Sequence, residues 1–424
     1  MKESFLHYIW QTAQFDHTDL KTVSGHSISI HKRGSAHHDG GPDFQNALIA
    51  IDGEKWAGQV EIHINSSDWF KHNHHLDSTY DGTILHVVYT YDADVTRTNG
   101  TIIPCLALNT RISKSLITTY DALTNNSHKI PCEMVLSKVA SQTKLLTIEA
   151  RAIDRLEAKS IPIFQKLQTC QNDWQEVLYQ MISRAFGMRV NKLPFELLSK
   201  QVPTRLLSKY TNIEYVTEAL LFGCAGFLNP QLKDDYGKHL YQEYAFLSKK
   251  HSLDTIPIEH WKFLRLRPTN FPTIRIGQLA AMIPSQQSLF ATVLEHMRYD
   301  SLKPIFDCQP NPYWSNHYRF DVESKPRKKS IGQGLYHNIL INAIVPVVYC
   351  YALHRNDLPL QDRCLTLMTE IAPEQNSITH YFQKQGFDLD SALHSQGVLH
   401  MHEKFCTFKD CLNCQIGHQI LTQP

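Results

Sequence analysis

Two acidic residues and a histidine lie close together in the first part of the chain, on a segment whose pattern predicts a β-hairpin. Asp43 follows Pro42, and one hairpin later Glu61 and His63 alternate with apolar residues. Side chains at positions i and i+2 of a strand share a face, so Glu61 and His63 should project together. Carboxylates that converge from paired strands form an oxygen-rich site suited to Mg²⁺ or Mn²⁺. The pattern therefore predicts a metal site in which Asp43 and Glu61 are ligands.

Such a site has the parts needed for hydrolysis. A bound divalent ion lowers the pKa of a water molecule and stabilises charge on a phosphoryl oxygen. A neutral imidazole can take a proton near pH 7, so we assign His63 the role of assisting the water. We therefore predict Asp43, Glu61 and His63 as the catalytic residues. The alternative is a half-exposed strand whose polar face happens to carry Glu61 and His63.

The length of the hairpin turn decides whether these side chains meet. A three-residue turn pairs Ile51 with Lys55. That register places Asp43 opposite His63, on the face of the predicted site. A two- or four-residue turn sends Asp43 to the other face unless a bulge intervenes near Pro42. The hypothesis therefore requires an odd-length turn or a bulge.

Further titratable residues follow the hairpin. His72 and His75 are three residues apart and would share one face of a helix, in a segment that ends with Asp77. These three residues could form a second shell around the metal or transfer protons; the alternative is a solvated polar loop. His86 lies in an apolar strand and belongs to the site only if its side chain faces the same way as Glu61.

Three cysteines near the end of the chain are the strongest indication of a metal-binding site in the sequence. They are spaced as Cys406-x₄-Cys411-x₂-Cys414. Three thiolates so close can bind Zn²⁺ or an iron–sulfur cluster, each of which normally needs a fourth ligand. The candidates for that ligand are Cys132, Cys364, His402 and His418. The alternative is a set of free buried thiols.

A proline-bounded stretch carries three arginines. Arg265, Arg267 and Arg275 lie around Pro268 and Pro272, which restrict the backbone. Arginine suits bidentate phosphate contacts, so the stretch predicts a phosphate clamp. The alternative is a network of salt bridges between domains.

The periodicity predicts an α+β protein. An amphipathic opening helix precedes residues 20–110, where apolar residues alternate as in strands. From about residue 140 the period changes to that of helices. We place the domain boundary in the polar segment Thr124–His128 and expect a mixed sheet followed by a larger helical domain. The predicted regions are a β-rich domain, a helical domain and a cysteine-rich tail, over residues 1–125, 126–405 and 406–424.

The composition is that of an ordinary globular chain. Its 424 residues are 42% hydrophobic and 20% charged, with 42 basic and 41 acidic residues. This balance excludes a histone-like binder and a charged disordered chain. The first residues lack the apolar stretch of a secretory signal, and the longest apolar run, Ile339 to Leu353, is too short and too interrupted to span a membrane. We expect a cytoplasmic protein with no membrane partner.

The spacing Asp43 … Glu61-x-His63 resembles the Asp … (Asp/Glu)-x-Lys signature of the restriction-endonuclease-like superfamily. The resemblance covers about residues 3–90. It implies that Asp43 and Glu61 bind the metal and that His63 stands where lysine is usual, without its fixed positive charge. Glu3, on the opening helix, matches an extra acidic residue that some members carry there.

Several segments together resemble a bacterial family described as domain of unknown function 2851. They include Gly41–Phe44, Val60–His63 with Asp68–Trp69, Leu85–Val88, Arg265–Pro272 and the cysteine-rich end. This resemblance spans nearly the whole chain but implies no activity.

The residues favour a metal-dependent nuclease that hydrolyses phosphodiester bonds of DNA or RNA. Nucleic acid is then the expected partner, and the sequence indicates no oligomeric state. One alternative is a scaffold that binds nucleic acid or protein and has a decayed site, since His63 replaces lysine. Another is a zinc-dependent hydrolase of small substrates, which would use the histidines.

Overall fold

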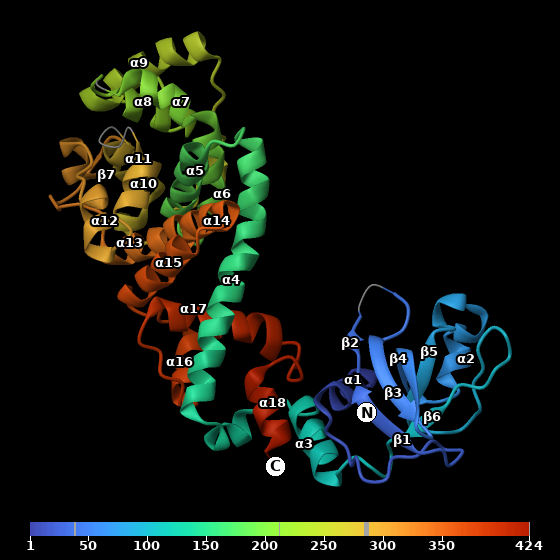
Figure 1. The fold of residues 1–424 in the computed structure, drawn as a ribbon. Helices are drawn as coiled ribbons and strands as arrows, with labels where there is room; N and C mark the ends of the chain where they lie inside the picture. Colours follow the sequence, from blue (N-terminus) through green and yellow to red (C-terminus); the bar gives the residue numbers. More distant parts are fainter. Residues whose placement is uncertain (38–39, 212, 284–287, 424) are drawn as a thin grey trace. The chain divides into compact units, whose positions relative to one another are not determined.

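The computed structural model describes residues 1–37, 40–211, 213–283 and 288–423 (Figure 1). The chain forms two compact units. The first comprises Met1–Thr147 and Met401–Pro424, and the second comprises Ile148–His400. The first unit contains a mixed sheet and the second is mainly helical, which confirms the predicted α+β class.

The sheet of the first unit combines antiparallel and parallel pairing. Its order is β1-β3-β4-β5-β6, and β2 pairs with part of β3. The pairs β1–β3 and β3–β4 are antiparallel, whereas β4–β5 and β5–β6 are parallel. The strands are β1 (Ile28–Lys32), β2 (Ser35–Ala36), β3 (Phe44–Ile51), β4 (Glu54–Asn65), β5 (Thr83–Thr90) and β6 (Cys105–Ala107).

The register of the β3–β4 hairpin is set by a short turn and a bulge. The turn has two residues, Asp52–Gly53, and both have positive φ angles, as the tight turns of hairpins require. The odd-length turn that we considered is therefore wrong. A β-bulge lies between Phe44 and Ala47, and Asn46 within it has a φ of 59°. Beyond the bulge the register brings Asp43 opposite Glu61, so both side chains share one face.

Short helices cover the sheet and connect its strands. Helix α1 (Glu3–Thr12) contacts β4 and buries Phe5, Leu6 and Ile9. The connection from β4 to β5 contains α2 (Asp68–Lys71) and the 3₁₀ turns η1 (His74–Leu76) and η2 (Ser78–Tyr80). In α2, Trp69 is fully buried and packs with Val95 and Ile103. This packing holds the connection against the parallel part of the sheet.

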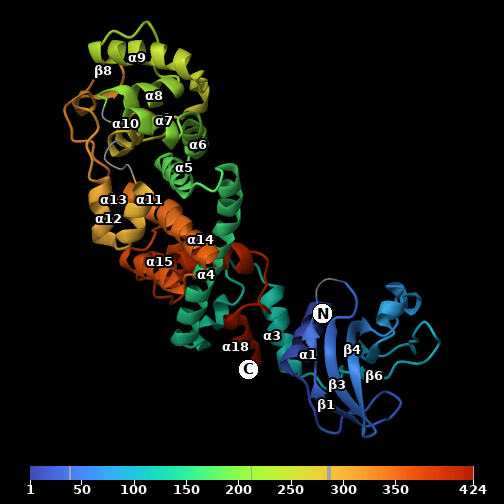
Figure 2. The same ribbon diagram turned by 45° about the horizontal axis from the view of Figure 1, so that its top comes forward.

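The end of the chain completes the first unit. Helix α18 (Gln415–Thr422) lies beside α3 (Lys114–Thr124) in both views (Figures 1 and 2). The Tyr8 hydroxyl and His418 Nδ1 lie 2.9 Å apart, which links α18 to α1. The last residues therefore belong to the same core as the sheet.

The second unit has one large apolar core. Its longest helix, α4 (Ser141–Thr169), begins in the first unit and contributes Leu156, Ile163 and Leu167 to that core. The other helices are α5 (Trp174–Phe186), α6 (Lys192–Gln201), α7 (Thr204–Leu207), α8 (Val216–Cys224), α9 (Asp235–His251), α10 (Pro272–Met282), α11 (Leu289–Glu295), α12 (Tyr299–Phe306), α13 (Gln333–Ile339), α14 (Val345–Arg355), α15 (Leu358–Glu370), α16 (Ser377–Lys384) and α17 (Ala392–Met401). A small hairpin joins β7 (His317–Arg319) and β8 (Val322–Glu323).

One helical stretch, Gln333–Arg355, has the length and apolar composition of a membrane span. It consists of α13, a π-helical turn at Leu340–Ile344, and α14. Of its most apolar window, 78% is buried inside the structure. A buried core helix has the same composition, so this stretch is weak evidence for a span.

Candidate metal centre in the first unit

Asp43 and Glu61 hold each other in place across the β3–β4 hairpin. The backbone N–H of Asp43 donates to Glu61 Oε2 at 3.0 Å, and the backbone N–H of Ile62 donates to Asp43 Oδ2 at 2.9 Å. Hydrogen bonds to ionised carboxylates are stronger than those between neutral groups. This reciprocal pair fixes both side chains and leaves Glu61 Oε1 facing a group of histidines.

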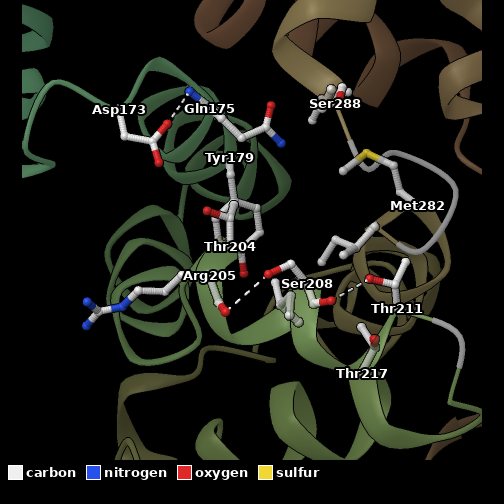
Figure 3. Close-up of a pocket in the computed structure, with 13 residues that line it drawn as sticks. Asp173, Gln175, Tyr179, Thr204, Arg205, Ser208, Thr211, Thr217, Met282 and Ser288 are labelled. Atoms are coloured by element: carbon white, nitrogen blue, oxygen red, sulfur yellow. Dashed lines mark hydrogen bonds between the residues drawn. The ribbon is translucent and has the colours of Figure 1, made fainter.

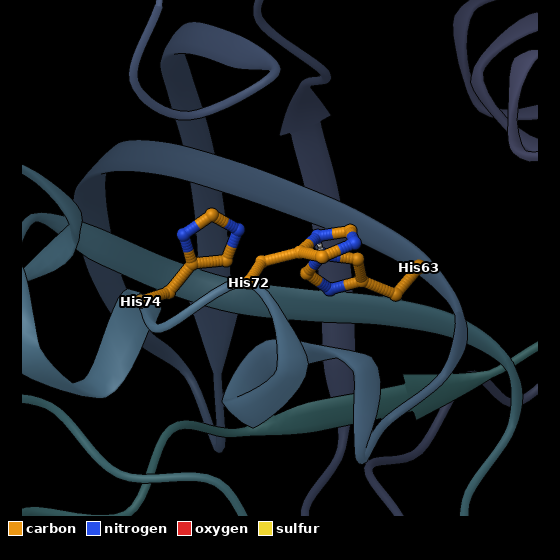
Figure 4. Close-up of side chains that lie close together, drawn as sticks. All are labelled: His63, His72 and His74. Atoms are coloured by element: carbon orange, nitrogen blue, oxygen red, sulfur yellow. Dashed lines mark hydrogen bonds between the residues drawn. The ribbon is translucent and has the colours of Figure 1, made fainter.

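Two histidines lie near that oxygen, and a third lies beside one of them. Nε2 of His74 lies 3.3 Å from Glu61 Oε1, and Nε2 of His63 lies 3.7 Å from it. His63 Nε2 is also 3.0 Å from His72 Nδ1. One ring nitrogen from each histidine lies within 4.8 Å of the others (Figure 4). Three imidazoles therefore gather at one place, and the Glu61 oxygen lies beside two of them.

The backbone at Asn73 brings two of these histidines together. His72 follows α2, His74 begins η1, and Asn73 between them has a φ of 61°. Asparagine tolerates this left-handed conformation better than most residues. The left-handed residue interrupts the helix and puts His72 and His74 at the same site. An unbroken helix would instead have placed His72 and His75 on one face.

His75 and Asp77 do not join this group. The half-buried ring of His75 packs against Phe70, with 5.1 Å between ring centroids. Asp77 is exposed and accepts a hydrogen bond from the backbone N–H of Thr79 at 2.9 Å, which caps η2. The structure does not bring them to the other donors, because the segment is not one continuous helix. His74, which we did not single out, takes the place that we expected for His75.

His86 supports the group from inside the sheet. It pairs with Glu61 in the parallel register, so it meets the condition that its side chain faces the same way. Its Nε2 lies 2.8 Å from His63 Nδ1, and its ring is fully buried. A partner on the second ring nitrogen fixes the orientation of a metal-binding histidine. His86 is therefore placed to position His63 and does not itself contact the place where the three imidazoles gather.

Burial lowers the pKa of two histidines, His63 and His86. Burial, together with neighbouring His86, lowers the pKa of His63 to about 2. Burial also lowers the pKa of His86 to about 3. Because metal ions bind the neutral imidazole, these rings need no deprotonation at neutral pH to act as ligands.

The buried polar atoms of the site fit a cation. Nε2 of His74 is buried and makes no well-formed hydrogen bond among the described residues, although Glu61 Oε1 lies 3.3 Å away. Burial raises the pKa of Glu61; neighbouring His74 opposes this effect, whereas the Asp43 carboxylate adds to it. A divalent ion would satisfy the imidazole nitrogen and stabilise the buried carboxylate.

Helix α1 adds a second acid and a fourth histidine beside the group. His7 Nε2 lies 3.3 Å from Asp43 Oδ2. Burial opposes protonation of His7, but Asp43 and Glu3 together raise its pKa. Burial raises the pKa of Glu3, which lies near His7 and Asp43. The sequence contained a signal for His7 that we did not use: it follows Glu3 by four residues, one helical turn away on the same face.

The site is buried on one side and open on the other. Glu61, His63 and His74 are buried, whereas His72 is exposed. The side chains of Asp43 and His7 keep 22% and 31% of their surface accessible. A molecule from solvent can therefore approach along the side formed by His72, Asp43 and His7.

The three predicted phosphate-binding arginines differ in their surroundings. Arg265 and Arg267 are exposed, and their role stays a prediction. Arg275 is buried in α10, where it donates hydrogen bonds to Gln278 Oε1 and Asn270 Oδ1. Burial lowers its pKa to about 10. The guanidinium group of Arg275 is therefore enclosed, and it is hydrogen-bonded to two side chains of its own unit.

The second unit contains a separate cavity of about 530 Å³ (Figure 3). Hydroxyl groups line much of it, among them those of Thr204, Ser208 and Thr211. Its carboxylate, Asp173, caps α5 by accepting from the backbone N–H groups of Gln175 and Glu176. Among the described residues that line this cavity, there is no group of donors like that in the first unit.

Comparison with known proteins agrees with the resemblance found in the sequence. Neither the curated proteins nor the solved structures include a match. A family model matches residues 3–377, well over half of the chain. The chain therefore belongs to the family described as protein of unknown function DUF2851.

Proposed function

We propose that the first unit is a metal-dependent hydrolase that cleaves phosphodiester bonds of nucleic acid. One observation carries this proposal: His63, His72 and His74 gather at one partly open place, with Glu61 Oε1 beside His63 and His74. The resemblance of Asp43 … Glu61-x-His63 to a nuclease signature supports the choice of substrate.

The donor set favours a transition metal. Imidazole suits Zn²⁺ and related ions, whereas Mg²⁺ prefers a shell of oxygen ligands. Three imidazole nitrogens and one carboxylate oxygen are therefore better matched to Zn²⁺ or Mn²⁺ than to the Mg²⁺ of the oxygen-rich site that the sequence suggested. Glu61, His63, His72 and His74 would hold the ion, and Asp43 would lie beside it.

The chain's own residues supply the rest of the chemistry. The ion, when bound, lowers the pKa of a water molecule and neutralises charge on the phosphoryl group. His7 lies on the open side, with Nε2 3.3 Å from Asp43 Oδ2, so it is placed to move a proton to or from the reacting groups. His86 fixes the ring of His63, and the Asp43–Glu61 pair keeps the hairpin rigid.

A second candidate function is hydrolysis of small phosphate esters or amides. It is favoured by the burial of Glu61, His63 and His74, which leaves access from one side only. A small ester enters such a site more easily than a polymer. A scaffold without activity is the third outcome to be tested.

The test uses metal-stripped full-length protein with DNA, RNA or a small phosphodiester, and with Mg²⁺, Mn²⁺ or Zn²⁺ added in turn. We expect cleavage of nucleic acid with Zn²⁺ or Mn²⁺. Glu61→Gln and His74→Ala should lower the rate by about 100-fold or more, because each removes a ligand. His75→Ala is the matched control, since the neighbouring histidine lies outside the group, and it should keep the rate.

Two outcomes would contradict the proposal in different ways. Cleavage of the small phosphodiester alone would favour the second candidate. Equal cleavage by the wild type, Glu61→Gln and His74→Ala would mean that the activity does not arise at this site.

A further inference from the structure

The cysteines of the C-terminal segment lie in the first unit together with Cys132, a residue far away in sequence. Cys132 and Cys411 are buried, and Cys406 and Cys414 are half-buried. Cys132 immediately precedes the 3₁₀ turn η3 (Glu133–Lys138), and Cys414 immediately precedes α18. Four thiols are thus contributed by two segments of the chain.

A lysine ties these two segments together. Lys409 lies between Cys406 and Cys411, and its Nζ donates to the backbone oxygens of Thr124 and Asn126 at 2.8 and 2.5 Å. The Asn126 side chain in turn donates to the backbone oxygen of Pro131 at 2.9 Å. Pro131 is the residue before Cys132, so this chain of hydrogen bonds fastens the loop of the tail cysteines beside Cys132.

Local backbone turns fold the tail back on itself. Cys406 ends a π-helical turn, and its oxygen accepts from the backbone N–H of Lys409 at 3.1 Å. Lys409 has a φ of 55°. The backbone N–H of Cys414 donates to the oxygen of Cys411 at 3.3 Å. At Gly417 an added Cβ would lie 2.0 Å from that same oxygen, so only glycine allows α18 to approach so closely.

The thiols interact electrostatically with one another. Burial raises the pKa of Cys406, and the neighbouring thiols of Cys132, Cys414 and Cys411 raise it further. Burial likewise raises the pKa of Cys132, with further contributions from Cys414 and Cys411. Four neighbouring thiols that would repel one another as thiolates are stabilised when a metal supplies the positive charge.

We infer that Cys132, Cys406, Cys411 and Cys414 together bind one metal centre, either a zinc ion or an iron–sulfur cluster. Four cysteines complete the ligand set of both kinds of centre. Of the other candidates for the fourth ligand, Cys364 is buried in α15 of the second unit, and His418 lies against Tyr8. The centre would fasten residues 401–424 to the rest of the first unit and is independent of the proposed hydrolase site.

The test measures metal in full-length protein purified without oxygen. To remove the contribution of the histidine site, the protein carries His72→Ala and His74→Ala. We expect about one zinc ion and no colour for a zinc site, or iron with a broad absorption band near ~400 nm for a cluster. Adding Cys132→Ser or Cys406→Ser should abolish the bound metal. Cys170→Ser, at a half-buried cysteine of the second unit, is the matched control and should keep it.

A second measurement does not depend on the folding of the variants. Titration of the same protein with a mercurial reagent that modifies thiols should release the metal as these cysteines react. Protein that contains neither zinc nor iron, or Cys132→Ser protein with its full metal content, would overturn the inference. Loss of hydrolysis with an intact cysteine centre would concern the proposed function alone.

Discussion

Nε2 of His74 lies 3.3 Å from Oε1 of Glu61, although a turn, a short helix and a left-handed asparagine separate the two residues along the chain. The contact joins the sheet to the connection between β4 and β5. It places an imidazole nitrogen of this connection beside a carboxylate oxygen of β4, so the site contains both nitrogen and oxygen donors. The site therefore depends on the backbone of this connection as much as on the ligands.

The conformation of Asn73 is the first feature to test. Asn73→Ala should destabilise the protein by ~1 kcal/mol, because an alanine side chain disfavours a positive φ. When the backbone at residue 73 leaves the positive φ, His72 and His74 separate, and the affinity for zinc should fall. Asn73→Gly should preserve the affinity, since glycine adopts this conformation freely. Competition with a chromophoric chelator measures both variants; equal affinities for Asn73→Ala and Asn73→Gly would speak against this role of the backbone.

His86 should influence metal binding without touching the ion. His86→Ala leaves His63 Nδ1 without its partner at 2.8 Å, so the ring is no longer fixed. Loss of such a supporting contact typically costs 10–100-fold in affinity, roughly the decrease expected here. His86→Gln, which keeps a hydrogen-bonding group, should recover part of that loss. The same chelator competition measures the effect, and an unchanged affinity in His86→Ala would refute it.

The bulge at Asn46 should decide on which face Asp43 lies. Deleting Asn46 removes one residue from β3 and shifts Asp43 by one register position, to the opposite face of the sheet. We expect loss of cleavage with little change in the far-ultraviolet circular dichroism spectrum. Asn46→Gly keeps the residue count and the positive φ, so it should keep activity. Full activity after the deletion would show that Asp43 is not needed where we place it.

Glu196 in α6 should give the second unit a pH-dependent stability. Burial acts to raise its pKa, but Lys166 and Arg184 outweigh this effect and lower the pKa to about 2. A carboxyl whose pKa is lowered in the folded state stabilises the protein at pH values above its pKa in the unfolded chain. This stabilisation is lost as the pH falls from that unfolded pKa toward 2. Because Arg184 is partly exposed, we expect Glu196→Gln to cost only about 1–2 kcal/mol at pH 7.

Urea unfolding at several pH values between 7 and 3 measures this contribution. The difference between wild type and Glu196→Gln should be constant near neutrality and should shrink below about pH 4.5. Glu157→Gln, at an exposed position of α4, is the control and should show no such trend. A difference that stays constant down to pH 3 would argue against the ion pairs.

Regular patterns in the sequence predicted the elements well. Asp52-Gly53 indicated the hairpin, and the alternation around Glu61 and His63 indicated their common face. The helical period expected from about residue 140 begins with α4 (Ser141–Thr169), which contains Pro162 and still continues to Thr169. Such features depend on local periodicity, and a single sequence contains that information.

Irregular backbone positions could not be predicted in the same way. The bulge at Asn46 and the left-handed Asn73 each change which side chains meet, and neither alters the hydrophobic pattern. Arg275 seemed available in the sequence because Pro268 and Pro272 were expected to restrict the backbone around the arginines. In the structure Pro272 is the first residue of α10, where a proline is well tolerated, and the helix buries the arginine.

The first unit is assembled from both ends of the chain, with the whole second unit encoded between them. During synthesis the strands emerge early, but α18 and three of the cysteines follow only after residues 148–400 have been translated. At ~5–20 residues per second this delay is on the order of tens of seconds. The inserted helical unit can therefore finish folding on the ribosome before the sheet acquires its last helix, and the early strands must stay soluble in the meantime.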